Sequence, residues 1–328
     1  MKPTIMDVAE RARVSKATVS RVLNQNPQVK GEIKERVLRA IEELEFRPSA
    51  IARNLATSRS NVVGLILPDI TNPYFPFIAR GIEDAAHQLG YSLFISNTDN
   101  DPRLEHEYIH KMVEQQVGGI VLISSTLQAD AVRELTSLQT PIVLCDRLID
   151  GTPFDSVSID NFKAAYEAVC YLISRGHRRI AHLAGPRNIQ SSENRKNGYL
   201  EAMRDANLEP FVSTGAFSFE SGIQQMDVVI EEYRPTALFA SNDLLALGAM
   251  QLIVQRGMTV PGDIAVIGCD DIPYGKMSRP QLSTISIPVY QLGVTALQLL
   301  ENQMKGGRDG TVNEILEHKI IHRESCGW

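Results

Sequence analysis

Apolar residues recur at helical spacing near the start of the chain and predict two short helices joined by a tight turn. Val8 and Ala12 lie one helical turn apart on the inner face of the first helix. Thr4 is placed to cap that helix, and Ser15 is placed to cap the second. Three inward-facing apolar residues follow this second cap: Val19, Val22 and Leu23.

A third amphipathic helix is predicted between Gly31 and Phe46. Its apolar stripe consists of Ile33, Val37, Leu38, Ile41 and Leu44. Three helices that share one core define a headpiece over residues 1–46. Pro48 ends the third helix, and residues 47–60 form a hinge helix and linker too short to be helical alone in water. A plain basic linker is the alternative.

From Val62 the pattern changes to short apolar runs that alternate with amphipathic segments. Strands are predicted near residues 62–68, 91–97, 118–124, 141–146 and 156–160, and again near 179–185, 237–241 and 264–270. Helices are predicted near 75–89, 103–115 and 129–138, and then near 161–175, 191–206, 222–232 and 242–255. This alternation is typical of parallel sheets with both faces covered. We therefore expect two doubly wound α/β lobes over residues 61–328.

Charge separates the two parts. The first 60 residues contain four Lys and eight Arg against one Asp and six Glu, a net charge of +5, whereas the whole chain carries −6 and the remainder −11. A basic headpiece attracts the phosphate backbone of nucleic acid, and an acidic body is repelled by it. No secretory signal precedes the helices, and no apolar run reaches the ~18 residues of a membrane span, so we expect a cytoplasmic protein without membrane contact.

The second helix presents small, polar and basic side chains on its outer face, a combination typical of a helix that enters the DNA major groove. These residues are Lys16, Ala17, Thr18, Ser20 and Arg21. Arginine can pair with guanine through two hydrogen bonds, and the methyl groups of Ala and Thr can contact a thymine methyl. An amphipathic hairpin with no DNA-binding role is the alternative.

Polar residues follow the predicted strands where parallel sheets bind ligands. They are Asp69, Asn72, Asp146, Asn242, Asp243, Asp270 and Asp271. Asn and Asp can bridge the hydroxyl groups of a sugar, and the aromatic rings of Tyr74, Phe75 and Phe217 can lie against its apolar face. Each Asp or Asn has an alternative role as a helix cap.

One motif points to an enzyme. His106-Glu107-Tyr108-Ile109-His110 is a literal HExxH on a predicted helix, as in zinc metalloproteases. The apolar residues of that helix leave His106 and His110 on its solvated side, and no metzincin continuation follows. The four cysteines are scattered without a CxxC pair. We therefore expect that the protein has no enzymatic activity, no metal site and no cofactor.

The segments TIMDVAERARVSKATVSRVLN, VLRAIEELEFRPSAIARNLAT and VGLILPDITNPYF resemble the LacI/GalR family of bacterial transcription regulators, and the likeness extends to Arg323. The resemblance implies a periplasmic-binding-protein-like core and a homodimer on a near-palindromic operator. It assigns base reading to Lys16, Ala17 and Arg21, and phosphate or backbone contacts to Thr18, Ser20 and Asn24, with Thr4 and Ser15 completing the DNA-binding set from the headpiece. It also places Leu55, with Ala52 beside it, as a wedge in the minor groove.

For the body, the resemblance implies a small-molecule effector that changes the angle between the lobes. It maps the effector site onto Arg195, Asn242 and Asp270, and less directly onto Tyr74, Phe75, Asp146 and Phe217. It also implies three crossings of the chain, with a first lobe at 61–160 and 289–320 and a second lobe at 161–288 and 321–328. The chain ends at Trp328 without a heptad tail, which favours a dimer.

Departures from the family pattern narrow the effector. Ile189 stands where purine-binding members carry a base-stacking arginine, so purine recognition is disfavoured. The catabolite-control members, which use a phosphocarrier protein as corepressor, are an alternative because their headpiece is similar. They carry paired basic residues on the helix corresponding to 291–305, where this chain has Leu297-Gln298-Leu299-Leu300-Glu301. A sugar or sugar derivative is therefore the favoured effector of a repressor.

Overall fold

The computed structural model describes residues 3–23, 28–46, 60–123, 135–147, 152–306 and 310–327. It divides into two compact units, residues 1–60 and 61–328, which are described separately below. Within the described residues, no helix is both long and apolar enough to cross a membrane. All four cysteines are free thiols.

The first unit is a three-helix headpiece consisting of α1 (Ile5–Arg11), α2 (Lys16–Leu23) and α3 (Gly31–Glu43). Its core joins the three helices through buried Val8, Ala9, Ala12, Val19, Val22, Val37 and Ala40. The prediction for Leu38 was wrong, because this side chain is 48% exposed while Ala40 is buried. Leu38 lies beside Val37 on the helix, and the narrow contact with α1 and α2 accepts only one of these two neighbours.

The first lobe of the body contains a parallel sheet in the order β11-β5-β4-β3-β1-β2. The strands are β1 (Val62–Leu67), β2 (Ser92–Asn97), β3 (Ile120–Ile123), β4 (Ile142–Cys145), β5 (Asp155–Ile159) and β11 (Asn313–Leu316). Three helices of this lobe are described: α5 (Tyr74–Gln88), α6 (Pro102–Glu114) and α13 (Val289–Met304). The helix predicted near 129–138 lies mostly outside the described residues.

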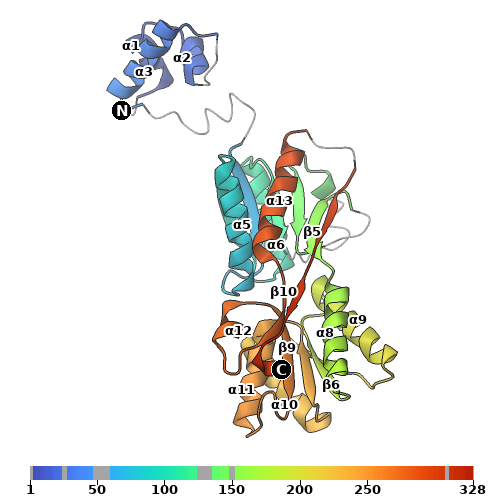
Figure 1. Ribbon diagram of the computed structural model, residues 1–328. Helices are drawn as coiled ribbons and strands as arrows, with labels where there is room; N and C mark the ends of the chain where they lie inside the picture. The colour runs from blue at the N-terminus through green and yellow to red at the C-terminus, as the bar shows by residue number, and fades with distance from the viewer. Residues whose placement is uncertain are drawn as a thin grey trace. The chain divides into compact units, whose positions relative to one another are not determined.

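Helices α5 and α13 come from distant parts of the sequence and lie against one another (Figure 1). Their close approach depends on two glycines. A Cβ atom at Gly81 would lie 2.2 Å from the Tyr290 carbonyl oxygen, and one at Gly293 would lie 2.2 Å from that of Ile78. Such distances are not tolerated, so a side chain at either position would separate the helices.

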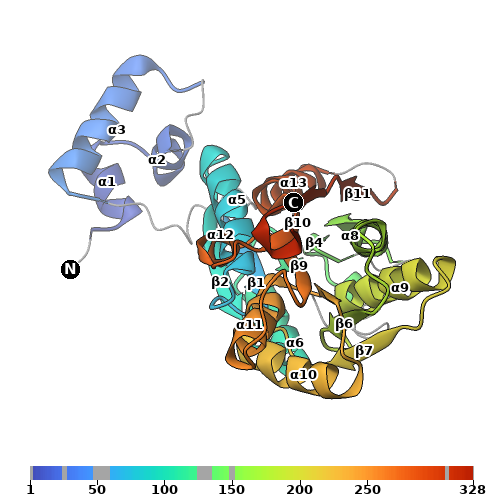
Figure 2. The ribbon, with the colours of Figure 1, turned by 60° about the horizontal axis from the view of Figure 1, so that its bottom comes forward.

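The second lobe repeats the architecture, with the strand order β12-β10-β9-β8-β6-β7. Its strands are β6 (Ile180–Ala184), β7 (Phe211–Thr214), β8 (Ala237–Ala240), β9 (Ala265–Asp270), β10 (Ser283–Ser286) and the antiparallel β12 (Lys319–Ile321). Its helices are α8 (Asn161–Ser174), α9 (Gln190–Asp205), α10 (Phe219–Glu232), α11 (Asp243–Gln255) and α12 (Pro273–Met277), with a 3-10 turn η1 (Glu324–Cys326). Figure 2 shows α8 and α9 on one side of these strands and α10 and α11 on the other.

The chain crosses between the lobes three times, after β5, after β10 and after β11. Figure 1 shows the strands that connect the lobes and the C-terminus in the second lobe. The last crossing ends where β12 begins at Lys319 and pairs with β10. The strands β7, β10, β11 and β12 were not predicted, because each has only three or four residues, of which at least one is polar.

Candidate DNA-reading helix and effector cavity

The caps predicted for α1 and α2 are present. Asp7 accepts hydrogen bonds from the Thr4 backbone N–H at 2.7 Å, and the Thr4 hydroxyl accepts from the Asp7 backbone N–H at 3.4 Å. The Ser15 hydroxyl accepts from the Thr18 backbone N–H at 3.1 Å. Between the two helices, Arg13 adopts a left-handed φ of 51° that turns the chain. These local interactions define where α1 and α2 begin and how the chain turns between them.

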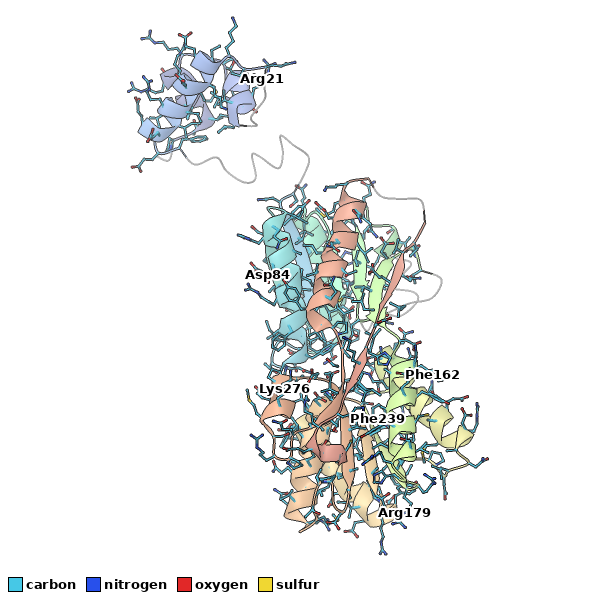
Figure 3. The ribbon with its side chains drawn as sticks, in the orientation of Figure 1. Arg21, Asp84, Phe162, Arg179, Phe239 and Lys276 are labelled. Carbon is cyan, nitrogen blue, oxygen red and sulfur yellow. The ribbon has the colours of Figure 1, made fainter. Side chains whose placement is uncertain are left out.

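The outer face of α2 carries the side chains that the sequence assigned to DNA. Lys16, Ala17 and Arg21 are exposed, and Thr18 and Ser20 are half-buried beside them. Arg21, labelled in Figure 3, lies on the outside of the headpiece. The outer face of α2 therefore presents two cationic side chains and several small ones, and no large apolar side chain among these residues. Asn24, Ala52 and Leu55, the remaining predicted DNA-binding residues, lie outside the described residues.

A cavity of about 330 Å³ lies between the lobes of the body, a size suited to a small ligand. All seven predicted effector residues line it: Tyr74, Phe75, Asp146, Arg195, Phe217, Asn242 and Asp270. They come from the ends of β4, β8 and β9, from α5 and α9, and from the loop before α10. Both lobes therefore contribute side chains, which brings together residues far apart in the sequence.

Arg195 is the cation of this cavity and is 3% exposed. Its Nε donates to the Asn161 side-chain oxygen at 2.8 Å, and its Nη1 donates to the Ser241 carbonyl at 2.6 Å. The Nη1 atom also lies 3.6 Å from a carboxylate oxygen of Asp270. Burial opposes the charge of Arg195, but Cys269 and the neighbouring carboxylates of Asp270 and Asp146 raise its pKa above the ordinary value. The guanidinium is thus held in place before any ligand arrives.

Tyr74 places a hydroxyl group at the cavity with the side chain only 4% exposed. Within the described residues this oxygen has no hydrogen-bond partner. Burial, together with the nearby carboxylates of Asp146 and Asp270, raises the pKa of Tyr74 well above its ordinary value, so the phenol stays protonated. A buried hydroxyl without a partner is uncommon, and this one lies at the cavity.

Asp270 and Asp146 both occupy left-handed backbone conformations, with φ of 122° and 58°. Burial raises the pKa of Asp270 well above its usual range, while the Arg195 guanidinium acts in the opposite direction. Left-handed conformations are costly for a residue with a side chain, and such strain gathers at binding sites. The two carboxylates are therefore directed into the cavity by unusual backbone turns at the ends of β9 and β4.

Asn242 and Asn72 show that capping and ligand contact are compatible. The Asn242 side-chain oxygen accepts from the Leu245 backbone N–H at 2.9 Å and caps α11. The Asn72 oxygen accepts from the Tyr74 backbone N–H at 3.1 Å. Both residues also line the cavity. The capping bonds engage the oxygens and leave the amide N–H groups as donors at the cavity, so a capping role does not exclude a ligand contact.

An apolar wall completes the cavity. A Cβ atom at Gly185 would lie 2.2 Å from a ring carbon of Phe217, so the glycine makes room for the ring. Ile189 also lines this cavity, as its position in the family pattern implied. Further lining residues were absent from the predicted site: Pro68, Asn100, Pro186, Asn188, Ser191, Ala216 and Ser218. Except for Ser191, which lies in α9, they follow the ends of β1, β2, β6 and β7, and only that position could have indicated them.

The HExxH segment lies on α6, away from this cavity. His106 and His110 are half-buried and contact each other, with their Nε2 atoms 3.2 Å apart, so the expectation that they are solvated was only partly correct. Glu107 forms an ion pair with Lys111. In the ranges that the structure describes, no group of three or more His, Cys, Asp or Glu residues is arranged to hold a metal ion.

A helix-turn-helix headpiece followed by a two-lobed body with a cavity between the lobes defines a DNA-binding transcription regulator. Residues 60–324 match the family model of periplasmic binding proteins and sugar binding domain of LacI family, and residues 4–49 match that of bacterial regulatory proteins, lacI family. The chain therefore belongs to the LacI family of bacterial transcription regulators. This membership confirms that it is not an enzyme, in spite of the HExxH motif.

Relatives match along the whole chain. Catabolite control protein A of Priestia megaterium is 38% identical over 331 residues, which cover 99% of each protein. The lac repressor dimer bound to operator and the anti-inducer ONPF is 30% identical, with a TM-score of 0.91 over 100% of both chains. The complex of the transcriptional regulator CelR with cellobiose is 30% identical, with a TM-score of 0.75 over 98% of this chain and 99% of that one.

Proposed function

We propose that this protein is a repressor that binds a near-palindromic operator as a homodimer and that a sugar or sugar derivative in the interlobe cavity controls its affinity for DNA. The observation that carries the proposal is the cavity, in which carboxylate, amide, guanidinium and aromatic side chains of both lobes converge. These groups suit a ring with several hydroxyl groups on its edge and an apolar face. The CelR–cellobiose complex, which has the same fold, supports a sugar.

The same proposal assigns the sequence reading to α2. Lys16, Ala17 and Arg21 contact base edges in the major groove, while Thr18 and Ser20 contact phosphates, as do Thr4 and Ser15 at the helix starts. From the sequence alone, Asn24 joins the phosphate contacts, and Leu55 enters the central base step with Ala52 beside it. The lac repressor dimer bound to operator supports this arrangement of two headpieces on one DNA site.

Exposed apolar side chains on the body support the homodimer. Ile70, Phe94 and Ile95 lie on or near β2, the edge strand of the first sheet, and each is 44–49% exposed. Val254 at the end of α11 and Met277 at the end of α12 are also exposed, at 58% and 71%. Exposed apolar groups of this size on an edge strand and on helix ends favour contact with a second copy.

Similarity to catabolite control protein A makes a protein corepressor the second candidate. The exposed residues of α13 are Tyr290, Gln291, Gln298 and Asn302, and exposed Lys305 follows at its C-cap. The ammonium group of Lys305 lies 2.7 Å from a carboxylate oxygen of Glu301, so this cation is already engaged in an ion pair on its own helix. This helix therefore offers no paired basic residues for a phosphorylated protein, and a small-molecule effector is favoured.

The proposal is tested by selecting DNA sites from a random library with the full chain and measuring affinity for the selected duplex by fluorescence anisotropy. We expect a near-palindromic site, and a sugar that changes the affinity by about 5- to 150-fold, the usual range of allosteric coupling. Leu55→Ala should weaken operator binding by well over about tenfold if the wedge bends the DNA. A protein that selects no common site, or that responds to a phosphorylated carrier protein and to no sugar, would contradict the proposal.

Arg21→Ala separates base reading from phosphate contact. It should weaken binding to the selected site by about 1–3 kcal/mol and relax the preference at one base pair, while affinity for random DNA changes little. The matched control is Arg39→Ala, which removes an exposed cation from α3, away from the predicted reading face. Equal losses on selected and random DNA would make Arg21 a phosphate contact.

A further inference from the structure

The cavity carries an excess of negative charge. Three carboxylates line it, those of Asp69, Asp146 and Asp270, and Arg195 is its single cationic lining residue in the parts of the body that the structure describes. With every group ionised, three carboxylates against one guanidinium leave a charge of −2, and a proton on Asp270 leaves −1. Arg147, the next residue after Asp146, lines a neighbouring cavity instead. The net charge of the residues that line the cavity is therefore negative whether or not Asp270 carries a proton.

Arg195 is poorly placed to serve as an anion clamp. Recognition of a phosphate or carboxylate by arginine commonly uses two parallel N–H groups of the guanidinium. Here Nε is committed to Asn161 at 2.8 Å and Nη1 to the Ser241 carbonyl at 2.6 Å. The charge itself is partly balanced by Asp270 at 3.6 Å. Only Nη2 is left without a bond to a described residue, so Arg195 offers a ligand single hydrogen bonds and little net attraction for an anion.

The polar groups that remain match hydroxyl groups. The Tyr74 hydroxyl is buried at the cavity and has no partner in the described residues, and the amides of Asn72 and Asn242 keep their N–H groups after capping. Ionised carboxylates such as those of Asp146 and Asp270 can only accept hydrogen bonds. A sugar hydroxyl can donate to a carboxylate and accept from a phenol or amide at the same time. An ionised phosphate or carboxylate can only accept.

We propose that the effector is an uncharged polyhydroxyl compound, a free sugar, and that Asp146 and Asp270 select it against phosphorylated and acidic forms of the same sugar. This inference rests on the proposed function. An anionic group about 5 Å from one of these carboxylates lowers affinity by about 100-fold at the effective dielectric of a protein site. The sugar hydroxyls gain charge-assisted hydrogen bonds in the same places.

The test is isothermal titration of the full-length protein at pH 7 with matched ligands: ribose and ribose 5-phosphate, glucose with glucose 6-phosphate and glucuronate, galactose and galacturonate, and cellobiose. We expect binding by at least one neutral sugar and affinity at least about 100-fold lower for its charged forms. Asp146→Asn should reduce this difference in affinity between a neutral sugar and its charged forms by about tenfold or more. The variant should fold normally, because asparagine tolerates the left-handed φ of 58° at this position.

Glu232→Gln is the matched control, because it removes an exposed carboxylate at the end of α10, outside the cavity, and should leave this difference in affinity unchanged. A phosphorylated or acidic sugar that binds more tightly than its neutral parent would overturn the inference and leave the sugar function intact. A difference in affinity that is the same in Asp146→Asn and in the wild type would show that the carboxylates do not cause the selection. Failure of every sugar, neutral or charged, would instead overturn the sugar function on which the inference rests.

Discussion

Replacing Tyr74 with phenylalanine should make the ligand-free protein more stable and its response to the effector weaker. The hydroxyl is buried and has no hydrogen-bond partner in the described residues. A buried polar group without a partner costs ~1–3 kcal/mol, and phenylalanine retains the rest of the ring packing. We expect a gain of about 1 kcal/mol, which raises the melting temperature of a domain of this size by about 2–4 °C.

Tyr199 provides the matched control because it is equally buried and its hydroxyl is bonded on both sides. It donates to the Ile180 carbonyl at 2.8 Å and accepts from the Phe211 backbone N–H at 2.7 Å. Tyr199→Phe leaves both backbone groups without this partner and should lower stability by about 1–3 kcal/mol. The same chemical change is therefore expected to have opposite signs at the two positions.

Differential scanning calorimetry of the wild type and the two variants measures these shifts without any ligand. Titration with a sugar that binds the wild type then measures the second effect, a loss of about 3- to 10-fold in affinity for Tyr74→Phe from one missing hydrogen bond. If Tyr74→Phe lowers the melting temperature as Tyr199→Phe does, the Tyr74 hydroxyl is bonded in the empty cavity. The inference that the Tyr74 hydroxyl is an unsatisfied group available to a ligand would then be refuted.

Three further substitutions test other parts of the fold. Burial lowers the pKa of His182 to about 3, whereas the pKa of histidine in the unfolded chain is about 6.5. Below pH ~6.5 the unfolded chain therefore binds a proton that the folded chain excludes, and the free energy of unfolding falls by up to ~1.4 kcal/mol per pH unit. His182→Gln should reduce this pH dependence in denaturant titrations at pH 7, 6 and 5, and an unchanged pH dependence would contradict the assignment. Gly185→Ala should displace the Phe217 ring, because the added Cβ would lie 2.2 Å from a ring carbon, and should lower sugar affinity by about tenfold in the titration described above. Arg13→Gly should stabilise the headpiece by ~0.5–1 kcal/mol by relieving the left-handed φ of 51°, seen as slower amide exchange in α1 and α2; faster exchange would show that the turn is not strained.

Local rules were sufficient for the headpiece and for most of the body. The caps at Thr4 and Ser15 were predictable because a capping bond spans only a few residues. The strands with uninterrupted apolar runs, such as β1 and β9, were predictable because both faces are buried. The short strands β7 and β12 were not, because pairing with a neighbour, and not their own sequence, makes them strands.

For the cavity, the strand-end rule indicated that Asp146, Asn242 and Asp270 would meet, and the structure brings them together. That they bind an effector stays a prediction. The contact of Arg195 with Asn161 was not predictable, because it joins α9 to the start of α8 across a distance that only the tertiary fold fixes. The absence of a hydrogen-bond partner for the Tyr74 hydroxyl was not predictable either, because it depends on which residues surround the side chain in the folded structure.

The pair Asp270 and Asp271 connects the cavity to the crossings between the lobes. Asp270 lines the cavity, whereas Asp271 forms an ion pair with Arg323 and accepts a hydrogen bond from the Ser286 hydroxyl at 3.1 Å. Lys276, labelled on α12 in Figure 3, lies 3.6 Å from the same carboxylate. Ser286 ends β10 just before the second crossing, and Arg323 follows the third crossing and β12. Both aspartates hold left-handed conformations, and their side chains leave the end of β9 in different surroundings, one at the cavity and the other between the second and third crossings.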